Sequence, residues 1–201
     1  MPRNVLRAAF VHAGTLILLA AASSASAGQQ PIDTARSSLT VFVYKSGLFS
    51  AFADDHVIKA PVASGSLAEN APARVESSVH AADLTVTDPT LAADRRAEVQ
   101  TKMVSADVLD VARFPEITFA STSIQPNGPD RWTVAGRLTL HGQTRSVSFP
   151  VARAGGAYRG EAQIKQRDFG IEPIRIAGGT VKVKDEVKIA FEIYPAATTK
   201  Q

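Results

Sequence analysis

Hydrophobic and polar residues alternate along most of the chain from Phe114 to Tyr194. Successive side chains of a β-strand point to opposite faces, so this period of two predicts strands with one buried and one solvated side. The apolar sets that share a face are Ile117 and Phe119; Trp132, Val134, Leu138 and Leu140; Val147, Phe149 and Val151; and Val187, Ile189, Phe191 and Ile193.

Short turn sequences separate these strands. Asn127–Asp130, His141-Gly142 and Ala154–Gly156 are typical hairpin turns. Several strands joined in this way predict an antiparallel barrel or sandwich. The expected strands are Ser38–Tyr44, Pro61–Leu67, Arg74–Val86, Glu116–Ile124, Arg131–Leu140, Thr144–Arg153, Tyr158–Arg167 and Val181–Tyr194.

One α-helix is expected between the strands, with Thr87 or Asp88 as its N-cap and Pro89 in the first helical position. It should end near Lys102 or Met103. A second short helix is expected over Asp107–Ala112.

Small residues dominate one face of the segment that begins at Arg74. Val75, Ser77, Val79 and Ala81 share this face. Small inward side chains leave room in the centre of a barrel, and that room can hold a ligand.

The N-terminus has the organisation of a secretory signal peptide. Arg3 and Arg7 precede an apolar run over Ala8–Ala22, and Ala25-Ser26-Ala27 is a small-residue cleavage site. We expect cleavage after Ala27, export to the periplasm, and one domain over residues 28–201. A membrane anchor is the alternative, but the apolar run is shorter than the roughly 20 residues of a spanning helix.

Export changes the charge of the protein. The full chain carries a formal charge of +3, and loss of Arg3 and Arg7 leaves +1. Lys182, Lys184 and Lys188 lie on one strand face with Glu186 between them, which favours a solvated face over a nucleic-acid surface. The chain has no cysteine, so its stability must come from core burial without disulfides.

Four sequence motifs resemble those of the YceI-like family. They are Ile32-Asp33 with Ser37-Ser38, Phe114–Thr122, Gly136–Val147, and Arg167–Ile171 followed by Val183–Val187. The motifs occur in the family's order and span nearly the whole exported chain. The resemblance implies an all-β, lipocalin-like extended antiparallel β-barrel with one or two short α-helices between strands.

The resemblance also implies a function. Family members bind a long isoprenoid or a similar amphiphilic lipid, such as a quinone, inside the barrel in the bacterial periplasm. Members are often dimeric, which leaves a homodimer open for this chain.

Burial of a hydrocarbon tail contributes about 0.8 kcal/mol per methylene, so such a site needs apolar walls and a mouth that accepts a polar head. Arg167 is the candidate for a phosphate head; the alternative is that it holds its own loop in place. The candidate wall residues, each of which could instead fill a solid core, are Phe42, Phe52, Val79, Phe119, Trp132, Val134, Phe149, Ile164 and Phe169.

Two other functions are kept as alternatives. The first is a soluble envelope stress protein whose solid barrel acts through its outer surface. The second is a metal-dependent enzyme that uses Asp54, Asp55 and His56 with His80 or His141, although adjacent residues of an extended chain point in opposite directions. There is no Gly-x-Ser-x-Gly motif and no cysteine nucleophile. We therefore predict a binding protein without a catalytic site, metal or cofactor.

Overall fold

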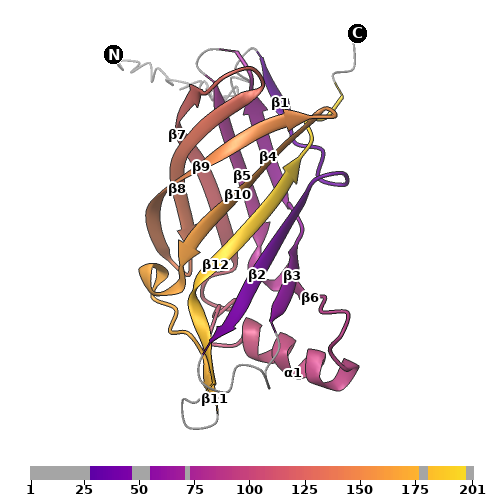
Figure 1. The fold of residues 1–201 in the computed structure, drawn as a ribbon, viewed down its shortest axis with the longest axis vertical. Coiled ribbons are helices and arrows are strands. Elements are labelled where there is room, and N and C mark those ends of the chain that lie inside the picture. Colours follow the sequence, from indigo (N-terminus) through magenta and orange to yellow (C-terminus); the bar gives the residue numbers. More distant parts are fainter. Residues whose placement is uncertain (1–27, 47–54, 71–72, 177–180, 198–201) are drawn as a thin grey trace, which may run out of the picture.

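The computed structural model describes residues 28–46, 55–70, 73–176 and 181–197. The described strands form one antiparallel 12-stranded sheet that curls into a barrel (Figure 1). The all-β, lipocalin-like fold predicted from the sequence is confirmed. The strands are β1 (Gln29–Pro31), β2 (Ser38–Ser46), β3 (His56–Ala60), β4 (Ser64–Ala68), β5 (Arg74–His80), β6 (Thr85–Val86), β7 (Glu116–Pro126), β8 (Arg131–Leu140), β9 (Gln143–Ala154), β10 (Ala157–Lys165), β11 (Arg175–Ile176) and β12 (Val181–Ile193).

The segments after the first and last strands of the barrel lie against each other. The strands pair in the order β1-β4-β5-β7-β8-β9-β10-β12-β2-β3-β6, and β11 pairs with β12. Ile32, just after β1, forms an antiparallel bridge with Pro195, just after β12. The Asp33 N–H donates to the Tyr194 carbonyl at 2.8 Å. These contacts join the segment after β1 to the segment after β12 at the upper end of the barrel in Figure 1.

The predicted hairpins from β7 to β10 form as expected. His141 and Gly142 both have positive φ, at 50° and 70°, as do Gly155 and Gly156, at 59° and 79°. This backbone twist matches the twist of the flanking strands and permits two-residue connections. His141 also packs against Phe114, with 4.5 Å between ring centroids, so it is a half-buried residue of the turn.

Two strand predictions were wrong in the first half of the barrel. The sequence predicts one strand over Pro61–Leu67, whereas the structure has β3 over His56–Ala60 and β4 over Ser64–Ala68. The predicted long strand over Arg74–Val86 ends at His80, where a 3-10 turn, η2 (Ala81–Asp83), turns the chain toward β6. The predicted inward face of this segment is nevertheless correct, because Val79 and Ala81 are both buried.

The helix also begins later than predicted. α1 spans Ala93–Val104, and neither Thr87 nor Asp88 caps it. Asp88 is only 2% exposed, and its carboxylate accepts the Val57 N–H and faces His56 Nδ1 at 2.7 Å. The carboxylate therefore joins its own loop to β3 instead of satisfying a helix terminus.

Replacement of Asp88 by alanine should lower the free energy of unfolding by about 1–3 kcal/mol, since the part-buried Val57 N–H loses its acceptor. Asp88→Asn retains an acceptor oxygen and should cost less. Urea denaturation measures both values. Asp83→Ala is the matched control: Asp83 is exposed, and its replacement should change stability by about 0.5 kcal/mol or less. An equal cost for Asp88 and Asp83 would contradict this role.

α1 covers an edge of the sheet. The side-chain oxygen of Gln100 accepts the Val86 N–H at 2.8 Å, and its amide nitrogen donates to the Leu84 carbonyl at 2.9 Å. These bonds satisfy backbone groups that a terminal strand would otherwise leave unpaired. The predicted second helix over Asp107–Ala112 is absent; this segment forms successive turns.

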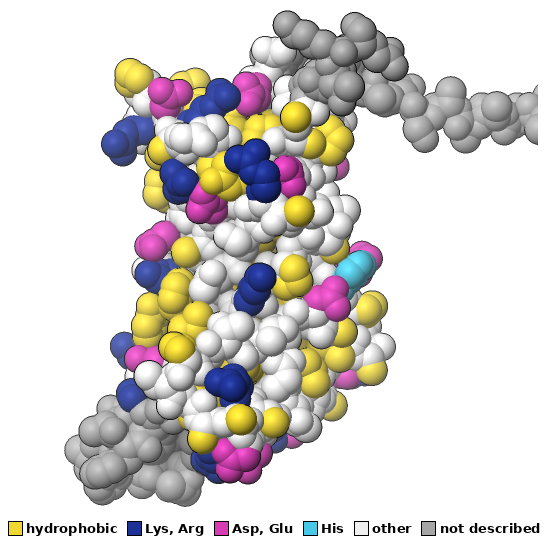
Figure 2. Space-filling view, turned by 90° about the vertical axis from the view of Figure 1, so that its right-hand side faces the viewer, with side chains coloured by type: hydrophobic (Ala, Val, Ile, Leu, Met, Phe, Trp, Pro, Cys, Tyr) yellow, Lys and Arg dark blue, Asp and Glu magenta, His cyan; other side chains and the backbone are white. Residues whose placement is uncertain are grey.

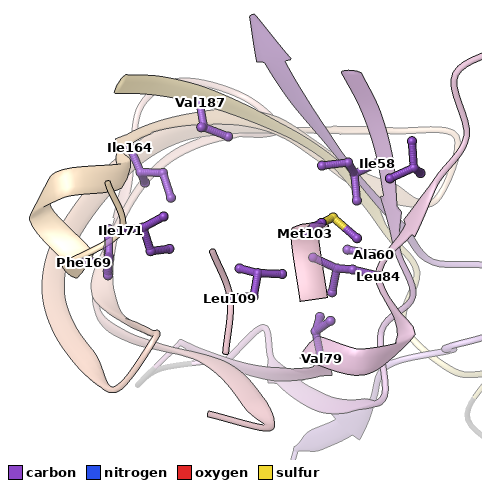
Figure 3. Packing of buried hydrophobic residues seen from close by; sticks show 11 residues of the cluster. Ile58, Ala60, Val79, Leu84, Met103, Leu109, Ile164, Phe169, Ile171 and Val187 are labelled. Carbon is purple, nitrogen blue, oxygen red and sulfur yellow. The ribbon is translucent and has the colours of Figure 1, made fainter. Parts of the chain in front are cut away.

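Apolar residues from outside the main strands fill the lower end of the barrel. Met103 of α1, Leu109 of the following turns, and Phe169 and Ile171 near η3 (Gln166–Phe169) are all buried; we call these four residues the plug. Figure 3 shows the plug within the ring of strands, together with Val79, Ile164 and Val187. Phe169 is 1% exposed and is the largest fully buried side chain of the described chain.

The outer surface is mixed in charge. Figure 2 shows acidic and basic side chains interspersed on one side of the molecule, most densely toward its upper end. The lysines of β12 point outward as predicted, and Lys188 lies over the Phe42 ring, 4.7 Å from its centroid. Within the described residues, no helix is long and apolar enough to cross a membrane.

Candidate functional site

The barrel encloses a cavity of about 380 Å³ between the plug and the upper end. This volume lies within the roughly 300–1,000 Å³ typical of sites for small organic ligands. Its lining is mainly aliphatic and aromatic. The described residues that line it are Ile32, Leu39, Leu67, Ala68, Glu69, Asn70, Ala73, Arg74, Val75, Ser77, Phe119, Ile124, Trp132, Val134, Leu138, Val147, Phe149, Val151, Arg153, Tyr158, Ala162, Ile164, Ile189, Phe191 and Ile193.

Strand parity explains why the cavity is apolar. Ala162 and Ile164 of β10 point inward, whereas Glu161 and Gln163 between and beside them are exposed. β12 alternates in the same way, with Ile189, Phe191 and Ile193 inward. The cavity exists because several inward positions are small, among them Ser77 and Ala162.

An aromatic stripe crosses five strands of the cavity wall. Phe119, Phe149 and Phe191 come from β7, β9 and β12, with ring centroids 5.5 and 5.3 Å apart in succession. Glycines occupy the intervening strands: a Cβ on Gly136 would come within 2.5 Å of the Phe119 ring, and one on Gly160 within 2.6 Å of the Phe191 ring. The two glycines therefore let the rings approach β8 and β10 closely.

Polar residues gather at the upper end of the cavity. Glu69, Arg74, Arg153 and Tyr158 line this end, and we call them the mouth. The Tyr158 hydroxyl donates to Glu69 Oε1 at 2.7 Å, and Arg153 Nη1 lies 3.5 Å from Glu69 Oε2. Trp132, the single tryptophan of the chain, lies below them with its ring centroid 5.7 Å from that of Tyr158. The cavity is thus apolar inside and polar at its opening.

Partial burial, the hydrogen bond to Glu69 and the Glu69 charge together raise the pKa of Tyr158 from 10.0 to about 12. The folded state therefore holds the phenolic proton more tightly than the unfolded state. The resulting stabilisation is complete below pH 10 and is lost as the pH rises toward about 12.

Alkaline titration followed by phenolate absorbance should show one tyrosine with a midpoint near pH 12, absent in Tyr158→Phe. Glu69→Gln should lower that midpoint toward 10.0, because the negative partner is removed. An unchanged midpoint in Glu69→Gln would show that Glu69 is not the hydrogen-bond partner.

Five of the predicted wall residues meet around the cavity: Phe119, Trp132, Val134, Phe149 and Ile164. Their contact with a ligand stays a prediction. Val79 and Phe169 also point inward, but they lie in the filled lower end.

Three predicted site residues lie elsewhere. Phe42 is on the outer face of β2 beside Lys188, and Phe52 lies outside the described residues. Arg167 follows β10 at the lower end; its Nε lies 3.3 Å from Glu172, and its backbone N–H donates to Asp185 at 3.0 Å. The contacts of Arg167 are those of the alternative, in which it holds its loop in place.

Sequence reasoning did not select Tyr158, Ala162, Ile189, Phe191 or Glu69. The first four could have been found from the alternation of their strands, because each occupies a position whose side chain points inward. Glu69 carries no such signal, because it follows β4 and reaches Tyr158 across 89 residues of sequence.

Four of the five residues of the metal alternative, Asp55, His56, His80 and His141, lie in the described chain. Asp54 lies outside the described chain. Among the described residues, no group of three or more histidine, cysteine, aspartate or glutamate side chains could hold a metal ion. His56 contacts Asp88, and His141 Nδ1 lies 3.2 Å from the Phe169 carbonyl oxygen.

Comparison with known proteins identifies the family. The YceI-like domain matches residues 31–194. A UPF0312 protein of Azotobacter vinelandii is 36% identical over 86 residues, and protein YceI of Salmonella arizonae is 35% identical over 85. These alignments cover 38% and 37% of this chain, and 45% and 44% of those proteins, so the chain spans about half the length of the curated relatives it matches.

Two solved structures share the fold. BcnA of Burkholderia cenocepacia superposes with a TM-score of 0.57 at 21% identity, covering 81% of this chain and 98% of BcnA. A polyisoprenoid binding domain of Saccharophagus degradans superposes with a TM-score of 0.54 at 14% identity, covering 83% of this chain and 96% of that domain.

Proposed function

Because the chain belongs to the YceI-like domain family, we propose that it binds an isoprenoid or quinone-like lipid within its barrel and carries it in the periplasm. The observation that supports this most directly is the apolar cavity of about 380 Å³ with a polar mouth. A polyisoprenoid binding domain of the same fold adds support from outside the chain.

The energetics of the cavity favour a hydrocarbon tail. Transfer of each methylene from water contributes about 0.8 kcal/mol, before the entropic costs of association are subtracted. The aromatic stripe offers flat surfaces, and the aliphatic side chains of β10 and β12 complete the wall. Such a site requires no catalytic group, and we propose a binding protein instead of an enzyme.

The surface-acting alternative has less support. It requires a filled interior, whereas only the lower end of the described barrel is filled by the plug. Its outer surface mixes both charge signs on the side seen in Figure 2.

Periplasmic carriage depends on the predicted signal peptide. β1 begins at Gln29, so cleavage after Ala27 leaves every described element in the exported chain. The intact mass of the protein purified from the periplasmic fraction should correspond to a chain that starts at Gly28. Retention of residues 1–27 in a membrane fraction would contradict this part of the proposal.

Lipid binding is tested by purifying the protein without detergent, extracting it with organic solvent and identifying the extract by mass spectrometry. The expected result is an isoprenoid or quinone in near-stoichiometric amount. An empty protein that also failed to take up added polyprenol or quinone would overturn the proposed function.

A further inference from the structure

The mouth joins a residue after β4 to the β9–β10 hairpin, which is distant from it in sequence. Glu69 follows β4, Arg153 lies near the end of β9, and Tyr158 lies near the start of β10. The Arg153 guanidinium lies 5.5 Å from the centroid of the Tyr158 ring, and both residues contact Glu69. A ligand whose tail fills the cavity must present its head to these three side chains.

The charges of the mouth are matched in pairs. Glu69 faces Arg153, and Arg74 Nε donates to Glu76 Oε1 at 2.8 Å. Asp130 adds a further negative field at Tyr158. Among the described residues that line the cavity, each positive charge therefore already has a carboxylate partner.

This arrangement suits some head groups and opposes others. A diphosphate requires several positive donors, as an arginine cluster or a row of backbone N–H groups supplies. Here it would approach a carboxylate and compete with it for Arg153, which is unfavourable. A neutral oxygen needs only one donor or acceptor. Arg153 has further N–H groups that can donate to a carbonyl, and Glu69 can accept from a hydroxyl, while the single Tyr158 proton stays on Glu69.

We propose that Glu69, Arg153 and Tyr158 form the head-group subsite, and that this subsite selects an uncharged oxygen-bearing head over a diphosphate. The ligand class is therefore a prenyl alcohol or a prenylated quinone. This inference rests on the proposed function, because it concerns the head of a lipid whose tail occupies the cavity.

Trp132 provides the readout, since it is the only tryptophan and it lines the cavity next to Tyr158. A geranylgeranylated quinone bound in the cavity should quench its fluorescence. Geranylgeraniol and geranylgeranyl diphosphate, which carry the same tail, are then titrated as competitors. The wild-type protein should bind the quinone and the alcohol at least about tenfold more tightly than the diphosphate.

Glu69→Gln tests the residue that sets this preference. It keeps the size of the side chain but leaves Arg153 without its carboxylate, so the preference over the diphosphate should fall about tenfold. Glu192→Gln is the matched control: Glu192 also pairs with an arginine, Arg159, but it does not line the cavity, and the preference should not change.

The outcomes separate the two proposals. Binding of the diphosphate as tightly as the neutral lipids, or an unchanged preference in Glu69→Gln, would overturn the head-group subsite while leaving lipid binding intact. A wild-type protein that bound none of the three compounds would overturn the lipid-binding proposal and the subsite with it.

Discussion

Replacement of Ala162 by phenylalanine should abolish tight lipid binding while leaving the barrel folded. Ala162 lies inward on β10, opposite Ile189 of β12, and lines the cavity. A ring at this position would displace about four methylenes of a bound tail, a loss of about 3 kcal/mol or about a hundredfold in Kd. Quenching of Trp132 by a prenylated quinone measures the change.

The same substitution separates a hollow barrel from a solid one. In a hollow barrel the new ring enters empty space and should change the free energy of unfolding by less than about 1 kcal/mol; in a packed core it would cost about 1–3 kcal/mol. Gln163→Phe, at the adjacent exposed position, is the control and should leave both binding and stability nearly unchanged. A destabilised Ala162→Phe protein that still bound lipid normally would contradict the cavity.

Replacement of Phe169 by alanine should have the largest effect on stability. Its side chain is 1% exposed in the plug, and loss of a buried phenylalanine typically costs about 3–5 kcal/mol. Thermal or urea unfolding measures the cost. Lipid affinity should change little under conditions where the variant is folded, because Phe169 does not line the cavity.

Phe42→Ala provides the comparison for Phe169→Ala. Phe42 is a partly exposed residue on the outer face, where it contacts Lys188, and its loss should cost about 1 kcal/mol or less. If the two substitutions were equally costly, Phe169 would not be the centre of a packed plug.

The sequence predicts the second half of the barrel to within one or two residues, because long strands with one buried face carry a strong alternation. The strand over Arg131–Leu140 is predicted with both of its bounds. The strands and the helix start in the first half of the barrel are predicted less accurately. β3 has only five residues, and the preference of Thr87 and Asp88 for helix caps is overridden by the contact of Asp88 with β3.

The sequence predicts which side chains of the candidate site point into the barrel, but not at which level along the barrel they lie. Strand alternation correctly places Val79 inward, but it does not show whether an inward residue lies in the filled lower end or in the cavity, because that depends on where α1 and η3 pack. Phe169 lies in η3, outside the strands, so alternation does not place it. Phe42 lies on the face of β2 opposite to Leu39. Apolar residues on both faces of this strand predict burial on both sides, but only the Leu39 face lines the cavity, and Phe42 lies outside beside Lys188. The contact of Glu69 with Tyr158 requires the closed barrel and has no local sequence signal.

The most direct test of a lipid-filled barrel is native mass spectrometry of the wild-type protein and of Ala162→Phe after incubation with a geranylgeranylated quinone. One lipid per wild-type chain, and none on the variant, is the expected result. An absence of bound lipid on the wild-type chain, or equal loading of both proteins, would contradict a ligand site inside the barrel.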